Sequence, residues 1–113
     1  MKLNDWAAEL PVSITVCDKK GIIAYVNDKS RKTFSSGTDD ELIGKNLKDC
    51  HSPESTAKLF HLIDTRKSNI YTIEKKGKKK MIIQIPWYKE NKVGGLVEFS
   101  LELPDDIPHF VRD

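Results

Sequence analysis

The chain has 113 residues, a formal net charge of +2 and 38% hydrophobic residues. This length predicts one domain, residues 1–113, and the patterned apolar positions exclude a disordered chain. So small a charge gives no reason to expect nucleic-acid binding, and no apolar run reaches the roughly 18 residues of a transmembrane helix. Because no signal peptide is recognisable, we expect a cytoplasmic protein in which Cys17 and Cys50 stay reduced.

The first quarter of the chain predicts a short helix followed by a β-hairpin. Residues 2–10 place apolar side chains at helical spacing, and Pro11 ends the pattern; the apolar positions are Leu3, Trp6, Ala7 and Leu10. Residues 14–18 and 22–27 are rich in β-formers. The turn between them contains Gly21, so the two segments read as paired strands.

The middle of the chain predicts helices. A short helix is expected from Asn27 or Asp28 to residue 34, and one further helical turn over residues 39–43, whereas residues 46–51 are ambiguous. The strongest start signal is Ser52 followed by Pro53, an N-cap and a first-turn proline. It predicts a longer helix over about residues 52–67.

The last third predicts strands over residues 70–74, 81–88 and 95–103, with a basic hairpin tip at 75–80 and a tail at 104–113. Five strands joined mostly by short turns favour an antiparallel sheet. The predicted fold class is therefore α+β, a five-stranded antiparallel sheet with a helical insert between strands 2 and 3. Residues 1–10 would form an N-terminal helix and residues 11–103 the core.

This order of elements, with three short motifs, resembles the PAS domain family over about residues 10–103. The motifs are an opening hairpin at 18–27 (DKKGIIAYVN), a step before the long helix at 43–47 (IGKNL), and the start of the last strand at 95–98 (GLVE). The resemblance implies a module for signal sensing or protein interaction in signal transduction, with ligands held between the sheet and the longer helix. It also implies homodimers formed through the outer face of the sheet and the N-terminal helix.

Residues 49–53 (DCHSP) resemble the Cys-His-Pro step of certain bacterial PAS domains, with Ser52 inserted before the proline. The tail at 107–112 is similar to the end of short bacterial proteins that consist of a PAS domain alone. The resemblance therefore implies a stand-alone PAS protein.

Helical and strand periodicity select the candidate pocket residues. At about 100° per residue, Leu59, Leu62 and Ile63 share one helix face. Alternation places Ile83, Ile85 and Trp87 together on one face of the fourth strand. With Cys50 and His51, these residues are the predicted lining of a site for a small apolar molecule, in which Gln84 and Ser100 are possible polar anchors. In a competing interpretation, side chains fill this space and the domain only contacts a protein partner.

The Cys50-His51 pair has two interpretations. It is either a structural turn before the helix or a redox-sensing, metal-binding or heme-binding pair. His61 points about 200° away from Leu59, so it is a poor heme ligand. We expect no metal, no cofactor and no enzymatic activity, because adjacent residues rarely form a catalytic constellation and no second Cys/His cluster exists. A heme- or redox-sensing domain using Cys50 and His51 is the alternative.

A run of lysines marks the predicted hairpin tip: Lys75, Lys76, Lys78, Lys79 and Lys80. No aromatic residue interleaves with them, so a platform for stacking nucleic-acid bases is absent. We expect a solvated tip that prevents edge-to-edge aggregation, with binding of an anionic partner as the alternative.

Overall fold

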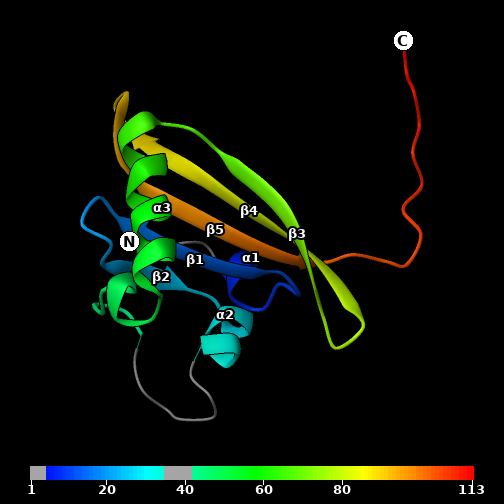
Figure 1. Cartoon of the computed structure of the whole chain (residues 1–113), viewed down its shortest axis with the longest axis horizontal. Coiled ribbons are helices and arrows are strands. Elements are labelled where there is room, and N and C mark those ends of the chain that lie inside the picture. The colour runs from blue at the N-terminus through cyan, green and yellow to red at the C-terminus, as the bar shows by residue number, and fades with distance from the viewer. Residues whose placement is uncertain (1–4, 35–41) are drawn as a thin grey trace.

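The computed structural model describes residues 5–34 and 42–113 (Figure 1). The described helices are α1 (Asp5–Ala8), α2 (Asp28–Phe34) and α3 (Pro53–Thr65), together with the 3₁₀ helix η1 (Leu47–Asp49). The strands are β1 (Ser13–Asp18), β2 (Ile23–Val26), β3 (Asn69–Lys75), β4 (Lys78–Lys89) and β5 (Lys92–Glu102). No helix in these described ranges is long and apolar enough to cross a membrane.

The five strands form one antiparallel sheet in the order β2-β1-β5-β4-β3. Strand β1 lies between β2 and β5, so the first and the last strand of the chain are neighbours in the middle of the sheet. The segment between β2 and β3 carries α2, η1 and α3. The predicted fold class is thus confirmed.

Two tight turns make the last three strands longer than the sequence predicted. Lys76 and Gly77 have φ angles of 53° and 77°, and Glu90 and Asn91 have φ angles of 53° and 66°. Two consecutive positive φ angles are typical of type I′ turns, whose twist matches that of paired strands. Pairing therefore continues to the turns, and most of the lysine run lies within β3 and β4.

The helices cover opposite faces of the sheet. In Figure 1, α3 crosses one face, and its buried residues Leu59, Leu62 and Ile63 form a core with Cys17 and Leu96 of the strands. We call this the inner face. On the other side, the outer face, α1 packs its Ala7 near β1. The predicted helix face of α3 is confirmed.

Local signals position α3 as the sequence predicted. The Ser52 side chain accepts a hydrogen bond from the backbone N–H of Ser55 at 3.1 Å, and Pro53 lies in the first turn. Arg66 adopts a left-handed conformation, with φ 57°, and ends the helix slightly before the predicted residue 67. Upstream, the ambiguous residues 46–51 contain η1, while the helical turn predicted over 39–43 lies mostly outside the described residues.

A buried asparagine ties the N-terminal elements together. Asn27 is 1% exposed, and its Oδ1 accepts hydrogen bonds from the backbone N–H groups of Ile14 and Ser30. Its Nδ2 donates to the carbonyl oxygens of Ala7 and Val12. All four bonds of the amide are thereby made, which joins α1, β1 and α2.

Candidate ligand pocket between the long helix and the sheet

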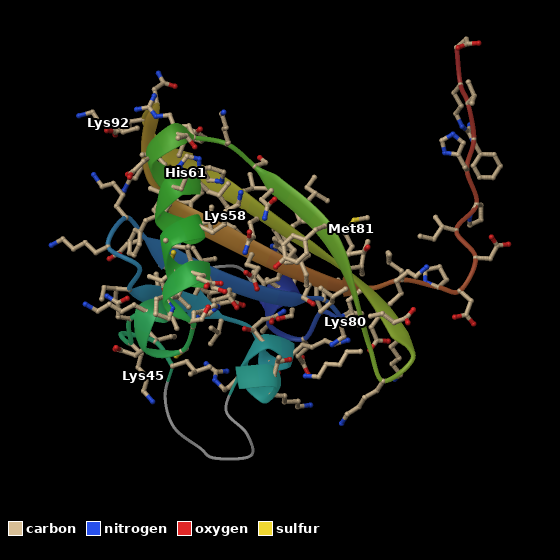
Figure 2. All side chains as sticks on the ribbon, viewed as in Figure 1. Lys45, Lys58, His61, Lys80, Met81 and Lys92 are labelled. Atoms are coloured by element: carbon tan, nitrogen blue, oxygen red, sulfur yellow. The ribbon has the colours of Figure 1, made fainter. Side chains whose placement is uncertain are left out.

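A pocket of about 520 Å³ lies between α3 and the inner face of the sheet. Its wall on the helix side comes from the end of the insert and the first two turns of α3, and its floor from β3, β4 and β5. In Figure 2, Lys58 extends from α3 on the side of these strands. The lining residues are His51, Glu54, Ser55, Lys58, Leu59, Asn69, Tyr71, Gln84 and Glu98.

The floor of the pocket is a row of polar side chains that runs across three strands. Asn69, Gln84 and Glu98 lie directly opposite one another in the sheet register. Nδ2 of Asn69 donates to Oε1 of Gln84 at 3.0 Å, and Nε2 of Gln84 donates to Oε2 of Glu98 at 2.9 Å. Because a carboxylate accepts hydrogen bonds, Glu98 fixes the orientation of both amides.

A small void continues the pocket toward the centre of the sheet. Its volume of about 10 Å³ is close to the space of a single water molecule. His51, Leu59 and Glu98 line both spaces. The rest of the void is lined by Thr15, Cys17, Leu47 and Leu96.

Burial changes the acid–base properties of two groups on the inner face. Burial raises the pKa of Tyr71, with a further contribution from the charge of Glu98. Burial also raises the pKa of the Cys17 thiol to about 11, and the charges of Asp18 and Glu98 add to the rise. A thiol with this pKa stays protonated at neutral pH, so Cys17 is not an activated nucleophile.

The structure brings only part of the predicted lining to this pocket. His51 and Leu59 line it, while Leu62 and Ile63 are buried in the adjoining core. The exposed Cys50 is outside its lining.

The strand residues Ile83, Ile85 and Trp87 lie on the outer face, so their predicted place in the lining is corrected. Trp87 packs there with Val97 and Phe99. The inner face of β4 carries Gln84, flanked in alternation by Ile82 and Pro86. Alternation in a sequence separates two faces but does not say which of them a helix covers.

The Cys50-His51 turn fixes one imidazole nitrogen. Nδ1 of the half-buried His51 lies 3.0 Å from the carbonyl oxygen of Leu47, and the backbone N–H of Cys50 donates to the same oxygen. No group of three potential metal ligands occurs within residues 5–34 and 42–113. His61 is exposed on α3, as predicted, and points away from the sheet (Figure 2).

Sequence reasoning missed most of the polar lining. Gln84 was predicted as a possible anchor, but Asn69, Tyr71 and Glu98 were not. Gln84 and Glu98 interrupt otherwise apolar strands, and this interruption is the signal in the sequence that points to a polar lining. Their alignment depends on the strand register, which depends in turn on both type I′ turns.

Comparison with known proteins agrees with this architecture. The sequence profile described as "PAS domain" matches residues 11–99. The chain belongs to the PAS domain family. No curated protein sequence matches it significantly.

Solved PAS domains share the fold at low sequence identity. The PAS domain of histidine kinase ThkA superposes with a TM-score of 0.66 at 18% identity, covering 80% of this chain and 97% of that one. A PAS domain from Colwellia psychrerythraea gives 0.64 at 18% identity, with 86% and 90% covered. VqmA of Vibrio cholerae gives 0.66 at 18% identity and 94% coverage of this chain, which spans 54% of VqmA.

Proposed function

We infer that this PAS domain is a sensory module that binds a small molecule between α3 and the inner face, and that it works as a homodimer joined through the outer face. PAS domains are signal-sensing modules in histidine kinases and similar proteins. The observation that carries the ligand-binding part is the pocket of about 520 Å³ with a hydrogen-bonded polar floor. Its size falls within the range of pockets that bind small molecules, about 300–1,000 Å³.

The chemistry of the lining favours binding over catalysis and favours a polar ligand over the apolar one expected from the sequence. Charged groups enter from both walls, Glu54 and Lys58 from the helix and Glu98 from the sheet. The protonated thiol of Cys17 supplies no nucleophile at neutral pH. We also place the protein in the cytoplasm, the compartment in which both cysteines would stay reduced.

Native mass spectrometry tests ligand binding. The purified protein is incubated with a small-molecule filtrate of cell extract, and we expect an adduct that is retained under gentle desolvation. Gln84→Leu removes the central member of the polar row while keeping a side chain of similar size, so this variant should lose the adduct. If the wild-type protein forms no adduct, the competing interpretation, a domain that only contacts a protein partner, replaces ligand sensing.

A heme sensor using Cys50 and His51 is the second candidate, because His51 lines the pocket. The charged lining supports a small polar molecule over an apolar macrocycle. An absorption titration with hemin separates the two functions. A Soret band that disappears in His51→Ala would establish the heme sensor, whereas we expect no saturable binding.

The outer face supports the homodimer. Ile70, Ile85 and Leu101 are 59%, 39% and 37% exposed there, and Trp6 of α1 is 62% exposed. A group of exposed large apolar side chains on one sheet face marks an interaction surface. VqmA, whose matching part shares this fold, is described as a dimer.

Two isoleucines of equal exposure provide a matched test of the dimer. Ile85 faces outward on β4 and Ile73 faces inward on β3, and both are 39% exposed. Ile85→Glu should convert the dimer to a monomer in size-exclusion chromatography with light scattering, and Ile73→Glu should not. A wild-type protein that is monomeric at high concentration would exclude the homodimer.

A further inference from the structure

The charged end of the polar row, Glu98, is a hydrogen-bond acceptor that lines the pocket, while Nδ2 of Asn69 and Nε2 of Gln84 each keep a second N–H. Gln84 uses its Oε1 to accept from Asn69 and its Nε2 to donate to Glu98. The row therefore runs in one direction and ends in Oε1 of Glu98, with Oδ1 of Asn69 at the other end. Within the described part of the chain, no side chain donates to either oxygen.

A half-buried carboxylate that faces a pocket selects its ligand by charge. An apolar molecule bound against Glu98 would remove water from the carboxylate without replacing its hydrogen bonds. A protonated amine supplies both an opposite charge and several N–H donors. The hydroxyl of Tyr71, which lines the same pocket and whose pKa responds to the charge of Glu98, adds a further polar group on this side.

We propose that the ligand is a small molecule with a protonated amine, and that this amine donates a hydrogen bond to Oε1 of Glu98. This inference rests on the proposed small-molecule function of the pocket and specifies its ligand class. Lys58 lies on the opposite wall of the pocket. It offers a contact to the carboxylate of an amino acid, which a simple amine lacks.

The experiment compares matched compounds that differ in one group. Each amino acid of a panel is tested beside the amine that lacks its carboxylate and the acid that lacks its amine, for example norleucine, pentylamine and hexanoate. Binding is followed by NMR through the side-chain NH₂ signals of Asn69 and Gln84, which report directly on the polar row. We expect compounds with an amine to shift these signals and the matched acids to leave them unchanged.

Two variants of β5 localise the amine. Glu98→Gln keeps the shape of the side chain and removes its charge, so it should weaken amine binding about 10- to 100-fold, the usual effect of losing a charged hydrogen bond. Glu102→Gln removes a carboxylate farther along the same strand, outside the pocket lining, and should bind like the wild type. Lys58→Met should weaken binding of amino acids and spare simple amines if the ligand is an amino acid.

The outcomes separate this inference from the proposed function. Acids or apolar compounds that bind as tightly as amines, or a Glu98→Gln variant with wild-type affinity, would overturn the amine and leave a ligand-binding sensor. If neither the three compound series nor the extract filtrate shifts any pocket signal, small-molecule sensing itself fails.

Discussion

Trp87 donates its indole N–H to the carbonyl oxygen of Cys17 at 2.9 Å, although the two residues are 70 positions apart. The ring belongs to β4 and its acceptor to β1, with β5 between them. Two glycines of β5 make this reach possible. A Cβ at Gly94 would lie 2.2 Å from the Trp87 ring, and one at Gly95 would lie 1.9 Å from the Cys17 carbonyl oxygen. The glycine pair thus leaves room for a hydrogen bond that joins the two halves of the sheet.

Gly94→Ala should displace the Trp87 ring and break its bond to Cys17. We expect the free energy of unfolding to fall by about 1–3 kcal/mol, the usual cost of overpacking. Trp87 emission should shift to longer wavelength against the constant background of exposed Trp6. Trp87→Phe keeps a smaller aromatic ring without the N–H, and the loss of that hydrogen bond should cost about 1 kcal/mol. A Gly94→Ala protein with wild-type emission and urea midpoint would contradict this account.

The thiol of Cys17 makes stability depend on pH in the alkaline range. Burial raises its pKa from 9.0 to about 11, so the folded state keeps a proton that the unfolded state loses. The thiol contribution is fully present below pH 9 and is lost as pH rises toward 11, by up to about 2–3 kcal/mol. Urea unfolding across this range should show a steeper decline for the wild type than for Cys17→Ala.

Cys50→Ala is the control for this pH dependence, because Cys50 is exposed. It should retain the wild-type slope, while alkylation at mildly alkaline pH should modify Cys50 and leave Cys17 intact in the folded protein. Equal slopes for the wild type and Cys17→Ala would show that other groups cause the alkaline decline.

Asn27→Ala should be strongly destabilising, because it removes four hydrogen bonds and leaves buried backbone groups of three elements without partners. We expect a loss of about 3 kcal/mol or more in the free energy of unfolding. The adjacent Asp28→Ala removes an exposed carboxylate whose ion pair with Arg31 spans 3.7 Å, and should cost less than about 1 kcal/mol. Chemical denaturation of both variants checks this, and similar losses would argue against the Asn27 network.

Two neighbouring residues of α3 should differ sharply in their effect on stability. Leu62 is 2% exposed in the inner core, so Leu62→Ala should cost about 2–5 kcal/mol. His61 is exposed, and His61→Ala should change the free energy of unfolding by less than about 0.5 kcal/mol. A large loss in His61→Ala would mean that α3 contacts something beyond the described domain.

The local signals of the sequence were enough to predict the order of elements and the start of the long helix. Ser52 and Pro53 act within one helical turn, and the spacing of Leu59, Leu62 and Ile63 needs no information about distant residues. Hydrophobic periodicity likewise separated the two faces of β4. These features depend on interactions between residues close in the chain, which is why sequence alone determined them.

The pocket required tertiary structure. Asn69, Gln84 and Glu98 meet because two type I′ turns set the register of three strands, and a slip of one residue would turn each side chain to the opposite face. Which face α3 covers also decides that Gln84, and not Ile83 or Ile85, lines the ligand site. Periodicity in the sequence determined which residues of this protein share a sheet face. Only the packing of α3 decided which of the two faces holds the pocket, and thereby gave the pocket a polar floor.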